Sequence, residues 1–383
     1  MTTGRVVRLA LCFFSIFVVF QVACGAPEVS DEDDAAAETD SVVLDDDASV
    51  SDDDAADDDV AADDDTVATD DDDDFADDDV LDDDISDDDF SDDDVADDDV
   101  VDDDLGDDDA PDPIRYKEFV FDRADVERDV VYGSNISQAG RNYVLKMDVY
   151  EGEGDTAANR PLIIMAHGSG GTTREFSSDG DFFARSGYVF ASIDYRLADT
   201  NNQYSDLFEL FDGIADIRAA VRFFRKHQND YRIDPDNIFI GGFSAGAVSA
   251  LHSAYMTKDR EVLKYISRFA FKYVEEHGGL DGDSGNPGYS SEVKGVINVA
   301  GGIVSTDLLD RGEPMIISVH GTDDKVIPFY EGISTEGSGL IHPVADALGI
   351  PNKLIAIQNG GHETLDACAL CPTRIRSFLY DHL

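Results

Sequence analysis

The stretch IFIGGFSAGAVSA, residues 238–250, combines a short apolar segment, a G-x-S-x-G motif and a run of small residues. The apolar residues predict a buried strand, and the small residues from Ala245 predict a helix directly behind the motif. A serine in such a strand-to-helix turn projects its hydroxyl above the sheet edge, and Gly242 and Gly246 avoid crowding around it. Short motifs also arise by chance, so the surrounding sequence has to support the prediction that Ser244 is a nucleophile.

From residue 114 to residue 383 the sequence alternates between strand-like and helix-like segments. We expect strands at 116–121, 129–132, 143–150, 161–167, 187–196, 238–240, 293–300, 314–320 and 353–358, and helices at 206–231, 245–255, 258–277 and 373–383. A Gly-, Ser- and Asp-rich loop at 278–291 either borders the active site or is a plain surface insertion. This alternation predicts one α/β domain over 114–383, with a mainly parallel sheet flanked by helices on both faces.

A serine needs a neighbouring base to act as a nucleophile, and histidine is a common one. His362 follows the last predicted strand, in the loop QNGGHE, where it can reach the same sheet edge as Ser244. The other histidines have different predicted roles. Glycine-containing turns begin at His167 and His320, and helix surfaces or packing account for His227, His252 and His277. No role is evident for His342 and His382. We therefore predict that His362 is the base.

A carboxylate should hold the imidazole of that base in place. The segment HGTDDKVIP, residues 320–328, follows the strand before His362 and offers Asp323 and Asp324. Its position gives the chain order Ser, Asp, His, which is the order of the α/β-hydrolases. The segment also resembles the H-G-x-x-D-x-x-x-P turn of that family, and the resemblance places the acid at Asp324. Spacing alone does not separate Asp324 from Asp323.

The segment HGSGG, residues 167–171, resembles the HGGG-type loop that supplies the oxyanion hole in the same family, with Ser169 in place of a glycine. The resemblance implies that N–H groups of Ser169 or Gly170, together with that of Ala245, bind the developing oxyanion. A serine at this position keeps the N–H donor but restricts the turn.

A fourth segment, SIDYRLA at 192–198, is similar to a run in carboxylesterases of this fold. There Asp194 and Arg196 are expected to brace the site rather than to perform chemistry. The four segments occur in the order typical of the family and together span nearly all of residues 114–383.

The resemblance implies the α/β-hydrolase fold and an esterase-type activity. We expect a serine carboxylesterase-type hydrolase that forms an acyl-enzyme and uses neither a metal nor an organic cofactor. The family favours ester substrates, including polymeric ones such as acylated polysaccharides or polyesters. Two alternatives stay open: a serine peptidase on the same fold, and a non-catalytic acidic surface protein.

Residues 1–24 are typical of an export signal. Two arginines precede an apolar run at 9–20, which is shorter than the roughly 20 residues that span a bilayer. The ending QVAC followed by glycine resembles a bacterial lipoprotein signal, which implies a lipid on Cys24. We therefore expect an exported protein of the bacterial cell envelope, held at the membrane only through that lipid. The alternatives are ordinary cleavage near residues 23–26 with secretion, and a permanent anchor.

Residues 25–113 form an Asp-rich segment. The stretch 31–112 holds 45 of the 85 acidic residues, in repeats such as DDDIS-DDDFS that place single apolar residues five apart. At about 100° per residue this spacing forms no apolar stripe, and neighbouring charges repel, so we expect a disordered spacer. Calcium binding is the alternative, although the spaced ligands and glycine of an EF-hand loop are missing. From Pro113 onward, 39 acidic and 26 basic residues offer no basic patch for nucleic acid.

Cys368 and Cys371 are the two cysteines beyond the signal region. After export they can close a small disulfide, or they can remain two idle thiols. Two ligands are too few for a structural zinc site, so we expect no metal there.

Overall fold

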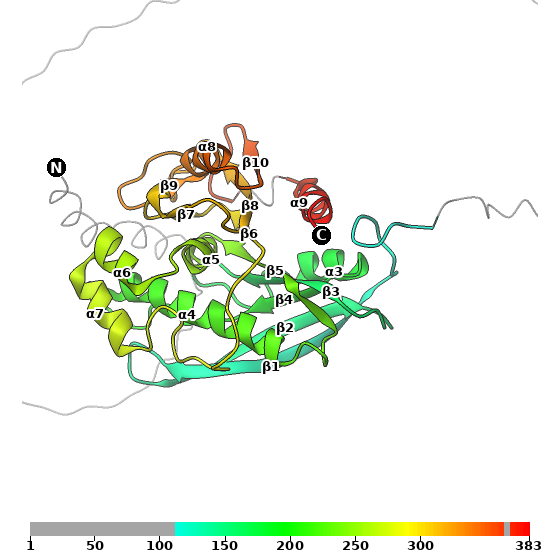
Figure 1. Ribbon diagram of the computed structural model, residues 1–383, viewed down its shortest axis with the longest axis horizontal. Coiled ribbons are helices and arrows are strands. Elements are labelled where there is room, and N and C mark those ends of the chain that lie inside the picture. Colours follow the sequence, from blue (N-terminus) through cyan, green and yellow to red (C-terminus); the bar gives the residue numbers. More distant parts are fainter. Residues whose placement is uncertain (1–111, 364–367) are drawn as a thin grey trace, which may run out of the picture. The chain divides into compact units, whose positions relative to one another are not determined.

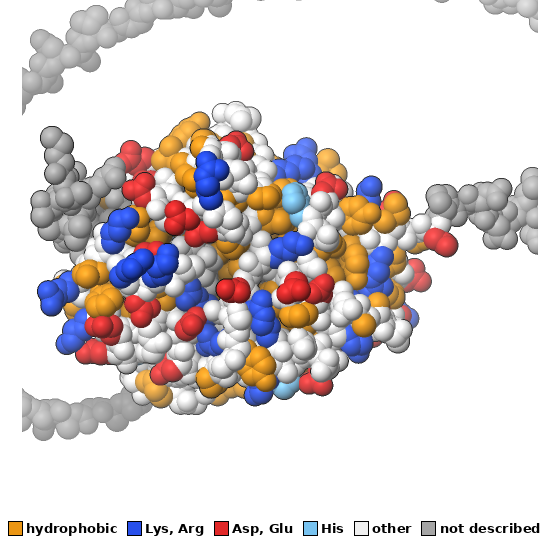
Figure 2. All heavy atoms as spheres, viewed as in Figure 1, with side chains coloured by type: hydrophobic (Ala, Val, Ile, Leu, Met, Phe, Trp, Pro, Cys, Tyr) orange, Lys and Arg blue, Asp and Glu red, His pale blue; other side chains and the backbone are white. Residues whose placement is uncertain are grey.

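The computed structural model describes residues 112–363 and 368–383 (Figure 1). The predicted export signal, the lipid site at Cys24 and the Asp-rich segment up to residue 111 lie outside these residues and stay predictions. Within the described ranges, no helix is both long enough and apolar enough to span a bilayer. On the face of the molecule in Figure 2, basic and acidic side chains are interspersed.

Eight strands form the central sheet in the order β1-β2-β4-β3-β5-β6-β8-β10. These are β1 (Ala124–Ile136), β2 (Asn142–Gly152), β3 (Arg160–Ala166), β4 (Val189–Ile193), β5 (Ile233–Phe243), β6 (Gly295–Val299), β8 (Met315–Gly321) and β10 (Asn352–Ile357). Strand β2 pairs antiparallel with β1 and β4, and all other neighbours pair parallel. The predicted mainly parallel sheet is therefore confirmed. A separate two-stranded sheet joins β7 (Gly302–Ile303) to β9 (Glu336–Gly337).

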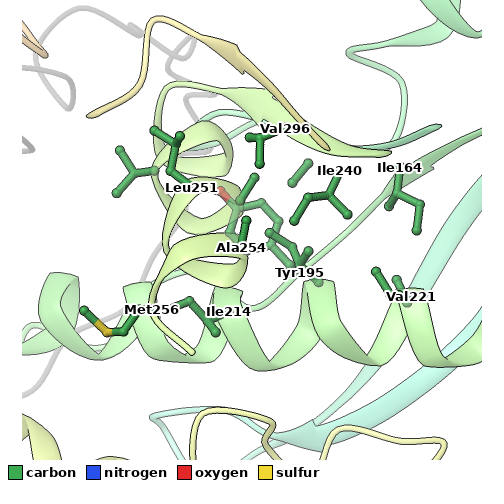
Figure 3. Close-up of a cluster of buried hydrophobic side chains, with 14 of the residues drawn as sticks. Ile164, Tyr195, Ile214, Val221, Ile240, Leu251, Ala254, Met256 and Val296 are labelled. Atoms are coloured by element: carbon green, nitrogen blue, oxygen red, sulfur yellow. The ribbon is translucent and has the colours of Figure 1, made fainter. Parts of the chain in front are cut away.

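Helices lie on both faces of the central sheet (Figure 1). They are α3 (Ser177–Arg185), α4 (Ser205–Lys226), α5 (Ala245–Tyr255), α6 (Asp259–Glu261), α7 (Arg268–Glu276), α8 (Ser338–Leu348) and α9 (Cys371–Tyr380), with a π-helical turn at Val262–Ile266 and a 3-10 turn at Thr306–Leu308. Helices α3 and α9 pack into the core on one face, and α4, α5 and α8 pack into the core on the other. Figure 3 shows part of this second core, where Ile214 and Leu251 lie beside Ile240 and Val296 of the sheet.

Strand β3 shows why the sheet is buried on both sides. Every residue from Arg160 to Ala166 is buried, and successive side chains alternate between the two cores, with Ile163 in one and Ile164 in the other. Because strand side chains point to opposite faces in turn, a strand covered on both faces has a continuous apolar sequence. Burying each of these branched side chains contributes roughly 1.5–3 kcal/mol.

The expected strand at 116–121 is wrong, because this segment consists of turns and bends. Tyr116 has a φ of 68°, and its ring packs edge-on against Tyr188 at 5.2 Å between centroids. The N–H groups of Val120 and Phe121 donate to the carbonyl oxygen of Arg185 at the end of α3. The alternating aromatic residues therefore serve to pack the segment against α3 and do not pair with a strand.

Two helices also differ in extent from the prediction. Helix α4 ends at Lys226 rather than at residue 231, because the chain then turns and Arg232 adopts a φ of 49°. The helical stretch expected at 258–277 is broken at Ser267, whose backbone is extended and whose hydroxyl accepts from the Ala270 N–H to start α7. Helix α8 was not expected, since Pro343 lies inside it and proline disfavours helix interiors.

Candidate active site

Ser244 occupies a strained turn between β5 and α5. Its φ of 52° and ψ of −117° lie in a region that residues with a side chain rarely adopt. A Cβ atom on Gly242 would lie 2.5 Å from the carbonyl oxygen of Ala166, and one on Gly246 would lie 2.1 Å from the same atom. Glycine is therefore required on both sides of the serine, since β5 and α5 meet the end of β3 too closely for a side chain.

The structure brings Ser244, His362 and Asp324 together, although they are far apart in the sequence. His362 Nε2 lies 2.8 Å from Ser244 Oγ, and His362 Nδ1 lies 2.8 Å from Asp324 Oδ2. Because the carboxylate only accepts, Nδ1 carries the hydrogen and Nε2 is left to accept from the serine hydroxyl. All three residues are buried, with 4–8% of their surface exposed. The arrangement can pass a proton from the serine to the imidazole.

Asp324, and not Asp323, contacts the imidazole of His362. Oδ1 of Asp324 accepts from the N–H groups of Val326 at 2.8 Å and Ile327 at 3.0 Å, which fixes the carboxylate. Burial alone would raise the pKa of Asp324, but hydrogen bonds from histidines and backbone outweigh it and hold the pKa well below its usual value. Asp323 is exposed and pairs with the side chain of Lys325.

A second histidine touches the same carboxylate. His320 is fully buried, and its Nε2 lies 3.3 Å from Asp324 Oδ2 and 2.9 Å from the carbonyl oxygen of Ile327. Its Nδ1 lies 2.8 Å from the hydroxyl of Ser338, the first residue of α8. From the sequence, His320 could be assigned only to the start of a glycine-containing turn. Its position four residues before the acid, in HGTDD, was the available signal.

The loop after β3 presents free N–H groups beside Ser244. The Gly168 N–H donates to Glu175 Oε1 at 3.1 Å, and the Gly171 N–H donates to the Gly168 carbonyl oxygen at 3.0 Å. In the described part of the chain, the N–H groups of Ser169 and Gly170 have no acceptor.

Ala245 supplies a third candidate donor. It is the first residue of α5, where N–H groups lack an acceptor within the helix. Ser169, Ser244 and Ala245 line one cavity, so the proposed oxyanion donors share a space with the nucleophile.

Of the two expected braces, Asp194 contacts the oxyanion loop and Arg196 does not. Asp194 Oδ1 accepts from the Thr173 N–H at 3.0 Å and lies 3.7 Å from His167 Nε2. Tyr195 stacks on the His167 ring and donates its hydroxyl to the His167 carbonyl oxygen at 2.9 Å. These contacts hold the start of the loop.

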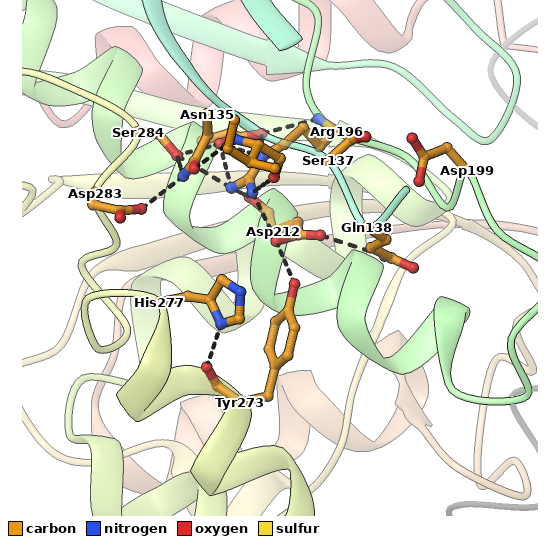
Figure 4. Close-up of polar contacts among 12 residues, drawn as sticks. Asn135, Ser137, Gln138, Arg196, Asp199, Asp212, Tyr273, His277, Asp283 and Ser284 are labelled. Carbon is orange, nitrogen blue, oxygen red and sulfur yellow. Dashed lines mark hydrogen bonds and ion pairs between the residues drawn. The ribbon is translucent and has the colours of Figure 1, made fainter. Parts of the chain in front are cut away.

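Arg196 belongs to a separate buried network (Figure 4). Its guanidinium contacts Asp212 at 2.9 Å, Asp216 at 2.8 Å and the Ser284 hydroxyl at 3.1 Å. Arg196 therefore ties α4 to the loop at 278–291, which packs against β1 through the hydrogen bond from the Ser134 N–H to the Ser284 carbonyl oxygen.

Two cavities flank Ser169 and Phe243. The first, beside Ser244, is lined by residues of α4, α5 and the segment that follows Asp324. The second contains Glu175, Glu363 and the start of α9 near Cys368. Cys368 and Cys371 are joined by a disulfide, which resolves the two alternatives left open by the sequence. In the described residues, no group of three His, Cys, Asp or Glu side chains is placed to hold a metal ion.

Comparison with known proteins bears on this site only in part. A family model described as BD-FAE matches residues 147–311, a range that includes Ser244 but ends before Asp324 and His362. Over 129 residues the chain is 30% identical to the quorum-quenching protein AidA of Acinetobacter baumannii (strain MDR-ZJ06), a match that covers 33% of this chain and 41% of that protein. The chain therefore spans less than half the length of this relative.

Solved structures match over a larger share of the chain. Thermogutta terrifontis esterase 2 phosphonylated by cyclosarin matches with a TM-score of 0.52 and 20% identity, covering 68% of this chain and 94% of that chain. The propionate-bound Est2 of the same species matches with a TM-score of 0.52 and 21% identity, and it covers the same shares of the two chains. A truncated carbohydrate esterase from gut microbiota matches with a TM-score of 0.50 and 18% identity, covering 67% of this chain and 95% of that chain. At these identities the likeness establishes the fold, and the prediction of an α/β-hydrolase fold is confirmed.

Proposed function

We propose that this protein is a serine hydrolase that cleaves carboxylic esters through a Ser244–His362–Asp324 triad. The observation that carries the proposal is the pair of 2.8 Å contacts that link the serine hydroxyl through the imidazole to a buried carboxylate. Such a chain of contacts, on a strained strand-to-helix turn, is the arrangement that activates a serine.

The reaction proceeds in two halves. Ser244 Oγ attacks the ester carbonyl carbon while His362 Nε2 takes the hydroxyl proton, and Asp324 stabilises the imidazolium. The tetrahedral intermediate collapses, the C–O bond to the alcohol breaks, and the alcohol leaves with the proton from Nε2. Water then attacks the acyl-enzyme, gives a proton to Nε2, and the acid is released as Ser244 Oγ regains that proton.

Backbone N–H groups stabilise the oxyanion of each tetrahedral intermediate. Those of Ser169 or Gly170, and of Ala245, are the donors, since they lack acceptors or begin a helix beside Ser244. In enzymes of this kind, loss of one such donor costs roughly 10²–10³ in kcat.

Ester rather than amide hydrolysis is favoured because several solved structures of similar fold are esterases. The purified protein should react with a fluorophosphonate and hydrolyse members of a panel of acetyl, feruloyl and longer-chain esters. Ser244→Ala should lose both properties, whereas Ser253→Ala, a buried serine elsewhere on α5, should retain them. Turnover of peptide amides but not of esters would instead assign a peptidase.

We also propose that the enzyme is exported and carried on its Asp-rich segment. The signal-like residues 1–24, the QVAC-G ending and the repeat at 25–113 support an enzyme tethered to the bacterial envelope through Cys24. Such a tether suits bulky or polymeric substrates. Cys24→Ser should move the protein from the membrane fraction to the soluble fraction. Unchanged partitioning would assign secretion or a retained anchor.

A further inference from the structure

The cavity beside Ser244 has apolar walls but is also lined by polar residues. Besides Ser244 these are Ser169, Asp206, Glu209, Ser249, Ser334 and Thr335. Leu210 and Val248 contribute to its apolar walls. Glu209, Ser334 and Thr335 also line it, and each of these three residues is 3–6% exposed.

Within the described residues, these three side chains leave part of their hydrogen-bonding capacity unused. Glu209 Oε2 accepts from the Ala198 N–H at 2.9 Å, but Oε1 accepts from no group in the described residues, and no cation pairs with this carboxyl there. The hydroxyl oxygens of Ser334 and Thr335 are buried and have no partner in the same part of the chain. Polar groups left in this state reduce stability unless something else satisfies them. A bound group can do so.

Glu209 can both donate and accept near neutral pH. Burial raises the pKa of Glu209 to about 7, and the nearby carboxylates of Asp206 and Asp212 add to the rise. The hydrogen bond from the Ala198 N–H acts in the opposite direction and lowers the pKa. The carboxyl is therefore suited to a neutral polar partner as well as to a cation. A methyl group of a bound acyl chain, placed beside Glu209, Ser334 and Thr335, would leave these side chains without a hydrogen-bond partner in the cavity.

The first cavity is the candidate acyl site of the proposed reaction. The leaving alcohol takes its proton from His362 Nε2, so it departs on the side of that histidine. Glu363, the next residue, lines the second cavity and not the first. The first cavity, which contains Ser244 and Ala245, is thus left for the acyl chain.

We propose that this cavity selects acyl groups that carry a hydroxyl, bound by Glu209, Ser334 and Thr335. The inference rests on the proposed ester hydrolysis and names its substrate class. A hydroxyl can donate to Glu209 and accept from Ser334, from Thr335 or from both. An ammonium group satisfies the acceptors only, because it cannot accept from the hydroxyls of Ser334 and Thr335.

Matched ethyl esters test the proposal, because a hydroxyl and a methyl group have nearly the same size. The pairs are glycolate with propionate, 3-hydroxypropionate with butyrate, and 6-hydroxyhexanoate with heptanoate, and 6-aminohexanoate tests a cation. Acid release is followed in a pH-stat with the full-length protein. We expect the hydroxy ester of one pair to exceed its methyl partner at least about tenfold in kcat/KM.

Variants connect that preference to the named residues. Glu209→Leu, Ser334→Ala and Thr335→Val should each lower the hydroxyl-to-methyl ratio of kcat/KM, and Glu209→Gln should keep part of it because an amide still bonds to a hydroxyl. Glu313→Gln is the matched control, since burial raises the pKa of Glu313 to about 7 as well, but this residue does not line the cavity. Its ratio should equal that of the unaltered protein.

The outcomes separate the two proposals. Absence of hydrolysis for every ester, with no fluorophosphonate labelling, overturns the proposed function. Hydrolysis with equal or better rates on all methyl-terminated partners, or a ratio that survives Glu209→Leu, overturns the hydroxyl site alone. Preference for 6-aminohexanoate over 6-hydroxyhexanoate also overturns it and assigns a cation site to the same carboxyl.

Discussion

His320 contacts Asp324, four residues later in the chain. Its Nε2 lies 3.3 Å from the same Asp324 oxygen that faces His362. The Ile327 carbonyl oxygen, 2.9 Å from that Nε2, can only accept, so Nε2 carries the hydrogen. Nδ1 then accepts from the Ser338 hydroxyl. The proposed acid is thus held between two imidazoles, and the Ser338 hydroxyl satisfies Nδ1 of the second one.

Ser338→Ala should therefore impair turnover, although Ser338 itself is not expected to contact substrate. Loss of the hydroxyl leaves the buried Nδ1 of His320 without its partner, so the imidazole can shift and disturb Asp324. We expect kcat to fall about tenfold, the cost of roughly one hydrogen bond, with KM unchanged. Ser318→Ala is the control, because Ser318 is equally buried and bonds to Asn298 but not to His320. Equal effects of both changes would mean a general packing defect.

Asp324→Asn should reduce kcat by about 10⁴-fold, since the imidazole loses the acceptor that sets its tautomer. Asp323→Asn should stay near the unaltered rate, because Asp323 is exposed, pairs with Lys325 and does not contact His362. Steady-state kinetics on a soluble ester gives both values. The reverse order of the two effects would place the acid at Asp323.

Glu209 should make the folded state less stable as the pH rises. Burial raises its pKa to about 7 from 4.5, so between these values the folded chain keeps a proton that the unfolded chain has lost. Stability therefore falls with increasing pH across this window, by on the order of 3 kcal/mol for this group. Glu209→Gln removes the effect.

Urea unfolding at pH 5 and pH 8 measures this difference. The Glu209→Gln protein should lose less stability than the unaltered protein between the two values. Glu276→Gln, at an exposed glutamate paired with Lys272, should behave like the unaltered protein. A pH dependence unaffected by Glu209→Gln would show that this carboxyl ionises freely in the folded state.

A chain shortened to begin at Pro113 should fold and hydrolyse small soluble esters at the full-length rate. The Asp repeats offer neither an apolar face nor a nucleophile, so we assign them only a positioning role. A flexible spacer of this length averages about 50 Å between its ends, and repulsion extends it. Circular dichroism and a soluble-ester assay check the prediction. A requirement for the tail in either measurement would favour a structural or calcium-dependent role.

The sequence by itself determined the features that depend on neighbouring residues. The turn at Ser244 could be predicted because strand, glycines and helix follow one another within 238–250. His362 and an acid at Asp323 or Asp324 could be predicted because each follows a strand of a mainly parallel sheet, and the carboxyl ends of parallel strands share one edge. That logic needs only the order of the elements. The choice of Asp324 over Asp323 came from the resemblance to the family turn.

Only the tertiary structure decided which side chains from distant elements meet. The contact between His320 and Ser338 depends on where α8 begins, and that helix could not be expected around Pro343. The cavity brings Glu209 of α4 beside Thr335, more than a hundred residues later, because α4 and the segment after Asp324 pack near α5. Local preferences specify strands, turns and helices, but the contacts between them depend on how those elements pack around a shared core, which no short stretch of sequence encodes.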